Sequence, residues 1–97
     1  MTSKERSYLM SLAQKIEPIC QIGKTGMSPE TTQSITEAFN THELIKVNVQ
    51  KNCLDDLNEL AQTTAERTHS EVVRVIGRKI ILYKQAKDPK DRKITFA

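Results

Sequence analysis

The sequence predicts an α/β fold with the element order α-β-α-β-α-β-β and a mixed four-stranded sheet packed with helices. Segments with helical spacing of apolar residues alternate along the chain with short segments rich in Val and Ile. Strands separated by helices pair in parallel through crossover connections, whereas only two residues join the last two strands. The sheet should therefore contain both parallel and antiparallel pairs.

Three segments are predicted to be helices: residues 3–16, 29–41 and 54–67. The first carries its apolar residues on one face and ends before Pro18, because a proline disfavours helix in the residue that precedes it. The second begins at Ser28, a good N-cap, with Pro29 at the first helical position. Asp55 and Asp56 favour the positive end of the third helix dipole.

Four segments are predicted to be strands: residues 19–22, 43–50, 72–76 and 79–84. Within residues 45–49 apolar and polar residues alternate, so one face of this strand is buried and the other carries Lys46 and Asn48. Gly77 and Arg78 separate the last two strands. A two-residue loop that starts with glycine fits a type II′ hairpin.

Length and charge set further limits. The 97 residues indicate one domain, residues 1–97, in which residues 85–97 form a charged C-terminal tail. The net charge is +3, and residues 71–97 hold eight Lys or Arg against three acids. This asymmetry favours a polyanionic partner, although a solvated tail without a partner explains the same charges. Since neither a run of about 18 apolar residues nor a signal-peptide pattern occurs, we expect a cytoplasmic protein without a membrane segment.

The segment Gly23-Lys24-Thr25-Gly26 connects a predicted strand to a predicted helix. Two glycines allow positive φ and a close approach of the backbone to a ligand. The helix start beyond the loop offers unpaired N–H groups that favour an anion, and Lys24 adds a positive charge. The loop therefore predicts a grip on a phosphate backbone. The alternative is a plain strand-to-helix turn with an incidental lysine, because glycine pairs also mark ordinary turns.

An enzyme is the competing class of protein. Two histidines, two widely separated cysteines and scattered acids form no catalytic triad, no metal cluster and no phosphate-transfer motif. We therefore expect a non-enzymatic protein without metal or cofactor. Aromatic residues make up 4% of the chain, so recognition by base stacking is not expected.

Three blocks of sequence resemble the signature blocks of the CRM domain, also named the CRS1–YhbY domain. They are Gly23–Gly26 after a short strand, His42–Val47, and Val75–Lys84. The resemblance covers about residues 3 to 84, and as a single short domain the chain is similar to stand-alone bacterial members. It implies a fold similar to the C-terminal domain of translation initiation factor three and a glycine loop comparable to that of KH domains.

The resemblance also implies an RNA-binding protein, a ribosome assembly factor that acts on ribosomal RNA of large-subunit precursors. Together with the basic surface, it gives these candidate RNA-binding residues: Gly23, Lys24, Thr25, Gly26, Lys46, Arg74, Arg78, Lys79 and Lys84. Asn48 and Lys84 stand where family members often have another basic residue and arginine, respectively. We expect a monomer. The alternative is a non-catalytic module that docks on a ribosomal protein, and salt separates the two, because phosphate contacts weaken steeply as salt rises.

Overall fold

The computed structural model describes residues 1–94. Its elements are α1 (Ser3–Ala13), β1 (Cys20–Ile22), α2 (Pro29–Ala38), β2 (Leu44–Val49), α3 (Leu57–Thr68), β3 (Glu71–Ile76), β4 (Lys79–Tyr83) and a short 3₁₀ helix, η1 (Pro89–Asp91). Apart from η1, this is the predicted order, and the α/β class with a mixed four-stranded sheet is confirmed. Most elements are shorter than predicted.

The strands lie in the order β1-β2-β4-β3. β1 and β2 pair in parallel, connected by α2, as the crossover rule predicts. The hairpin strand β4 lies between β2 and β3 and is antiparallel to both, so β2 and β3 are not neighbours. Of the two hairpin loop residues only Gly77 has a positive φ, 55°, as a type II′ turn requires.

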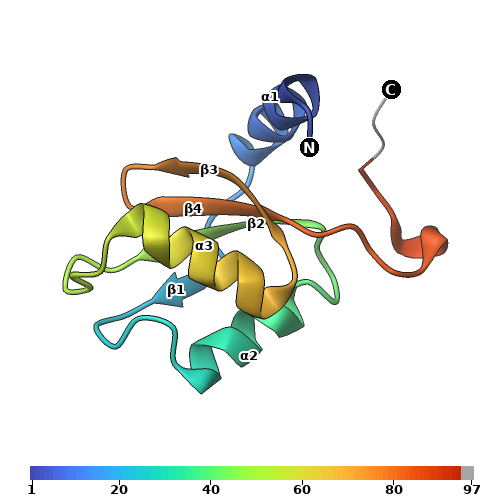
Figure 1. Cartoon of the computed structure of the whole chain (residues 1–97). Helices are drawn as coiled ribbons and strands as arrows, with labels where there is room; N and C mark the ends of the chain where they lie inside the picture. Colours follow the sequence, from blue (N-terminus) through green and yellow to red (C-terminus); the bar gives the residue numbers. More distant parts are fainter. Residues whose placement is uncertain (95–97) are drawn as a thin grey trace.

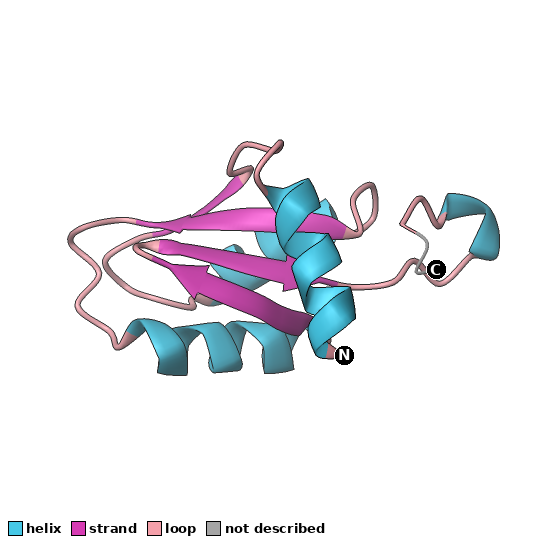
Figure 2. Cartoon of the chain, turned by 90° about the horizontal axis from the view of Figure 1, so that it is seen from above, coloured by secondary structure: helices cyan, strands magenta, loops and turns pink. Residues whose placement is uncertain are grey.

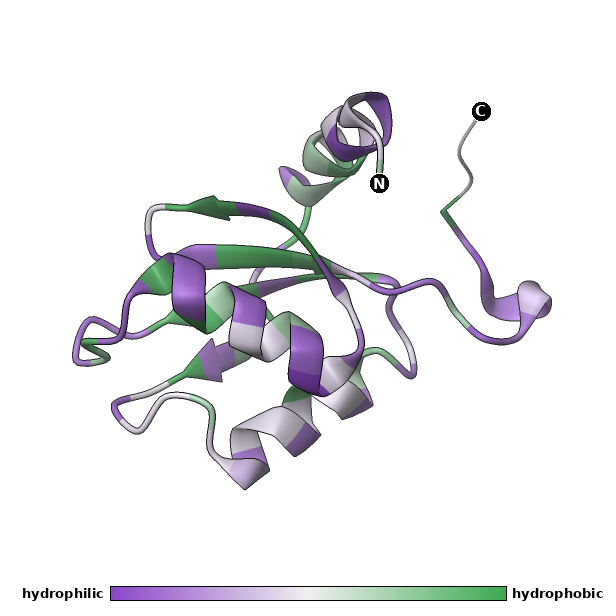
Figure 3. Ribbon diagram, viewed as in Figure 1, coloured by the Kyte–Doolittle hydropathy of each residue, from purple (hydrophilic) through white to green (hydrophobic). Residues whose placement is uncertain are grey.

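Helices cover both faces of the sheet (Figures 1 and 2). α2 and α3 pack on one face, and α1 crosses the other. Because strand side chains alternate between faces, each face has its own apolar cluster. The larger cluster, beneath α2 and α3, includes Ile22, Ile35, Ile45, Val47, Val49, Leu60, Ile80 and Leu82. The smaller one, beneath α1, comprises Leu9, Ala13, Leu44, Val73, Ile81 and Tyr83. In Figure 3 much of the hydrophobic colour lies on the strands, interrupted by hydrophilic segments, while the outer surfaces of α2 and α3 are mostly hydrophilic.

Capping residues set the helix starts. The Ser28 hydroxyl accepts the Thr31 N–H at 3.2 Å, and Pro29 is the first residue of α2, as predicted. α3 begins at Leu57 and not at residue 54, because the Asp56 carboxylate is its N-cap and accepts the Glu59 N–H at 3.0 Å. Residues 54–56 therefore belong to the loop that precedes α3.

β3 contains an irregularity that the sequence pattern did not reveal. Its register with β4 shifts between Val72 and Arg74, as at a β-bulge. Val73 is buried in the cluster beneath α1, and Arg74, the next residue, lies opposite Ile81 of the same cluster. Residues directly opposite on neighbouring strands share a face. The bulge therefore brings Arg74 to the α1 face, where strict alternation would have turned it away.

A buried carboxylate anchors the C-terminal segment. Glu43 is only 7% exposed, and its oxygens accept the N–H groups of Ala86 at 2.9 Å, Lys93 at 2.6 Å and Ile94 at 3.0 Å. Burial alone would raise the pKa of this carboxyl, but the three N–H donors, helped by Arg92, lower it below its ordinary value. Of the predicted tail, Ile94 packs on the α1-face cluster, while residues 95–97 lie outside the described residues.

Candidate nucleic-acid interface

The glycine loop is a closed turn at the end of β1. The Gly26 N–H donates to the Gly23 carbonyl at 3.0 Å, which leaves Lys24 and Thr25 at the two central positions, both exposed. Gly26 is buried and has a φ of 69°, in the left-handed region. The turn therefore presents Lys24 to solvent on a defined backbone.

Each of the two glycines in this loop lies against a different neighbouring side chain. A Cβ added at Gly26 would lie 2.6 Å from the Asp55 Oδ2 atom, closer than van der Waals contact allows. A Cβ at Gly23 would lie 3.3 Å from the Gln50 Oε1 atom, a tight contact with a flexible side chain. Both neighbours belong to residues 50–56, the loop between β2 and α3. The glycine loop is thus packed against this second loop.

Further hydrogen bonds hold the chain between the loop and α2. The Arg67 guanidinium, from α3, donates to the Met27 carbonyl at 2.7 Å. The Ser28 N–H donates to the Gly26 carbonyl at 3.0 Å, and the Ser28 carbonyl accepts the Thr32 N–H at 2.9 Å. The first turn of α2 therefore satisfies much of its own hydrogen bonding. Lys24 remains the main candidate for contact with an anion, and it forms no salt bridge within residues 1–94.

Three strands bring predicted basic residues together on the α1 face of the sheet. Lys46 of β2 and Arg74 of β3 lie opposite Ile81 of β4, one on each side, and Lys79 lies opposite Asn48. The alternation predicted for β2 is confirmed, because Lys46 and Asn48 are half-buried on this face while their neighbours enter the core. α1 covers only one end of the face, and the end from which the glycine loop leaves is open (Figure 2).

Arg78 has a different position from the one expected of an RNA contact. Its half-buried guanidinium donates to the carbonyls of Val49 at 3.1 Å, Gln50 at 2.6 Å and Cys53 at 2.8 Å. These three charge-assisted bonds fix the loop after β2 to the β3–β4 hairpin. The structure therefore places Arg78 as an anchor for the loop that supports the glycine turn.

Lys84 lies apart from the other candidates, just past the end of β4 that is remote from the glycine loop. Its ammonium group donates to the Thr68 carbonyl at 3.1 Å and stands 5.9 Å from the centre of the Phe39 ring. The register thus places Lys46 and Arg74 at the middle of the sheet, Lys79 and the Lys24 turn toward the end where β1 and β2 finish, and Lys84 past the opposite end.

Four residues of this region had no place in the sequence-based prediction of the site. Arg67 holds the glycine loop from α3, Gln50 and Asp55 pack on its two glycines, and Lys51 is exposed beside them. The contacts of Arg67, Gln50 and Asp55 join residues far apart in sequence, so no local pattern shows them. Lys51 carried a local signal, because it stands two residues after the last residue of β2, as Lys24 does after β1.

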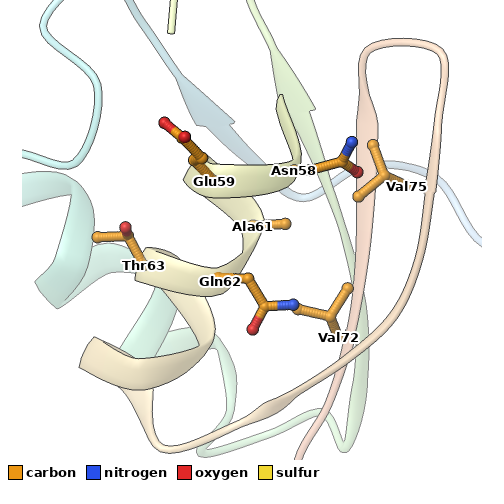
Figure 4. A pocket seen from close by; sticks show the side chains of 7 residues that line it. All are labelled: Asn58, Glu59, Ala61, Gln62, Thr63, Val72 and Val75. Carbon is orange, nitrogen blue, oxygen red and sulfur yellow. The ribbon is translucent and has the colours of Figure 1, made fainter. Parts of the chain in front are cut away.

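Other features of the described chain do not compete with this site. A hollow of about 520 Å³ between α3 and β3 is lined by apolar and polar side chains, with Glu59 as its charged member (Figure 4). A carboxylate there opposes phosphate binding. Within residues 1–94 no three His, Cys, Asp or Glu side chains are grouped as metal ligands. Among the helices of that range, none combines the length and apolar character needed to span a bilayer.

Comparison with known proteins identifies the fold and the family. The family model described as the CRS1 / YhbY (CRM) domain matches residues 1–84. The "Probable RNA-binding protein YqeI" of Bacillus subtilis is 39% identical over 90 residues, which cover 93% of this chain and 94% of that protein. An "RNA-binding protein" of Haemophilus influenzae is 27% identical over 90 residues, 93% of this chain and 91% of that one. Neither relative is named as an enzyme, in agreement with the expectation of a non-enzymatic protein.

A solved structure agrees with these matches. The solution structure of "hypothetical protein SAV1595" from Staphylococcus aureus superposes with a TM-score of 0.81 at 43% sequence identity, covering 98% of this chain and 99% of that one. The agreement extends over both faces of the sheet, since almost all of each chain is included. The three blocks singled out in the sequence, the observed fold and these matches lead to one conclusion: the chain belongs to the CRS1/YhbY (CRM) domain family.

Proposed function

We propose that this protein binds RNA through the sugar–phosphate backbone, using the glycine loop and the basic side chains of the α1 face. The observation that supports this most directly is the convergence of Lys46, Arg74 and Lys79, from three strands, on one face of the sheet whose edge strand, β1, leads into the turn that carries Lys24. Positive charges spread over one rigid surface match a polyanion of regular spacing. The names of the two bacterial relatives give the same ligand class.

Backbone recognition fits the aromatic residues better than base recognition does. Tyr83 and Phe39 are buried at 7% and 9% exposure, and Tyr8, on α1, is 41% exposed. Within the described residues, therefore, the strands offer no exposed aromatic ring on which a base could stack. The resemblance to the CRM family extends the proposal to its finer form: a monomeric, cytoplasmic factor that binds ribosomal RNA in large-subunit precursors.

A salt titration of RNA binding tests the proposal. In the variant Lys46→Ala/Arg74→Ala/Lys79→Ala, removal of about three phosphate contacts should lower the slope of log affinity against log salt by roughly 2 for single-stranded RNA. A charge-matched control removes Lys4, Arg6 and Lys15, which lie on or just after α1, and should leave the slope unchanged. Equal slopes for the two variants would show that the open sheet face is not the RNA surface.

A second experiment addresses the ribosomal partner. Sucrose-gradient fractions of growing cells should contain the protein with large-subunit precursors more than with mature ribosomes. The sheet-face variant should shift toward the top of the gradient, because it lacks the phosphate contacts. Wild-type protein found only in the free fractions at low salt would contradict the ribosomal part of the proposal and leave general RNA binding intact.

A further inference from the structure

The glycine turn has a neighbour of the same construction. β1 and β2 are adjacent and parallel, and Ile22 pairs with Val49 at their ends. One residue later the Gln50 N–H still donates to the Ile22 carbonyl, at 2.8 Å. Each strand is then followed by a closed turn: the Gly26 N–H donates to the Gly23 carbonyl at 3.0 Å, and the Cys53 N–H donates to the Gln50 carbonyl at 3.0 Å.

The two turns carry the same kind of side chain at the same place. The first has Lys24 and Thr25 at its central positions, and the second has Lys51 and Asn52. All four residues are exposed. By continuation of the strand register, Lys24 and Lys51 occupy equivalent positions on chains that leave the sheet about 4.8 Å apart.

The second turn is held as firmly as the first. Arg78 donates to the Gln50 and Cys53 carbonyls, at the two ends of the turn, while the Arg78 carbonyl accepts the Val49 N–H at 2.7 Å. Cys53 itself is 2% exposed, so the end of the turn is anchored in the core. The backbone that carries Lys51 is thus rigid, and a preorganised backbone reduces the entropy lost when a ligand binds.

The charges at the twin turns are not neutralised by ion pairs. Within residues 1–94 neither Lys24 nor Lys51 forms a salt bridge. Two carboxylates lie near the turns: Asp56 is engaged as the N-cap of α3, and Asp55 lies against Gly26 without forming a salt bridge to Lys24 or Lys51 within the described residues. Two positive charges on the turns that follow adjacent strands repel each other, and an anion bound between them relieves that repulsion.

We propose that Lys51 is a second phosphate-binding residue that acts together with Lys24, so that the twin turns hold neighbouring phosphates of one RNA strand. This rests on the proposed RNA binding and adds to it a residue and a geometry. Arg78 has the role of a positioning residue for Lys51, which explains why a basic residue of the hairpin donates to main-chain carbonyls.

The test is a salt titration with a short, mixed-sequence single-stranded RNA. Lys24→Ala and Lys51→Ala should each lower the slope of log affinity against log salt by roughly 0.7, and the double variant by roughly 1.4. Lys51→Arg retains the charge and should bind like wild type. Lys15→Ala, an exposed lysine just after α1, is the control for the loss of one charge and should not change the slope. Thermal melting of each variant establishes that it is folded.

The outcomes separate the two levels of the proposal. If Lys24→Ala lowers the slope and Lys51→Ala behaves like Lys15→Ala, the twin-turn inference is wrong and RNA binding by the glycine loop stands. If both lysine variants bind like the control while wild type binds RNA, the turns are not the phosphate site at all. If wild-type protein does not bind RNA, the proposed function fails together with this inference.

Discussion

The substitution Gly26→Ala tests how the glycine loop is built. Gly26 has a φ of 69°, where a residue with a side chain is disfavoured by about 1–2 kcal/mol. The new Cβ would also lie 2.6 Å from the Asp55 Oδ2 atom, so Asp55 must rotate, at about 0.5–1.5 kcal/mol if it leaves its preferred rotamer. We expect a loss of about 2–3 kcal/mol in the free energy of unfolding. For a domain of this size that corresponds to a melting temperature lower by roughly 10–20 °C.

The assay is urea denaturation followed by circular dichroism, with Gly23→Ala as the matched control. Gly23 has no positive φ, and its added Cβ would meet only the end of the flexible Gln50 side chain, at 3.3 Å. The free energy of unfolding of Gly23→Ala should therefore fall by less than about 1 kcal/mol. In an Asp55→Ala background Gly26→Ala should lose only the backbone part, about 1–2 kcal/mol. Equal losses for the two glycine variants would refute the argument.

The same geometry decides which variants are suitable for RNA-binding experiments. Gly26→Asp would place a second carboxylate against Asp55, so any loss of binding would mix disruption of the loop with electrostatic repulsion. Lys24→Ala removes one exposed charge and leaves the turn hydrogen bond between Gly23 and Gly26 in place. It is therefore the better probe of the loop.

Two further predictions concern the anchoring groups. Arg78→Lys keeps the charge but loses the planar guanidinium, so urea denaturation should show a free energy of unfolding lower by about 2 kcal/mol. An unchanged urea midpoint would mean that the three hydrogen bonds to carbonyls contribute little to stability. Glu43→Gln should speed hydrogen exchange of the Ala86 amide most, because Ala86 donates to Oε2 while Lys93 and Ile94 share Oε1, and a carboxamide keeps only one acceptor oxygen. Since the pKa of Glu43 is lowered in the folded state, its stabilisation is present above the unfolded pKa of about 4.3 and is lost as pH falls through the lowered value. The free energy of unfolding of Glu43→Gln should accordingly fall less than that of wild type as the pH is lowered. An equal dependence on pH in the two proteins would contradict this role of Glu43.

Much of the fold followed from local patterns in the sequence. The alternation within residues 45–49 predicted which face Lys46 occupies, and Ser28 with Pro29 predicted the start of α2. A glycine in a two-residue loop predicted the hairpin at Gly77. These signals act over a few residues, through side-chain periodicity, capping and allowed φ, so they are visible without tertiary structure.

The sequence by itself determined the element order, the family resemblance and the position of the glycine loop, because each depends on residues close together along the chain. Only the tertiary structure decided how the predicted site residues are used. The bulge in β3 brings Arg74 to the α1 face, and the insertion of β4 places Lys79 beside Asn48. The guanidinium of Arg78 meets the Cys53 carbonyl 25 residues away, and the Glu43 carboxylate meets the Lys93 amide 50 residues away. Such contacts depend on which strands become neighbours, and the strand order is set by the burial of the whole sheet between its helices.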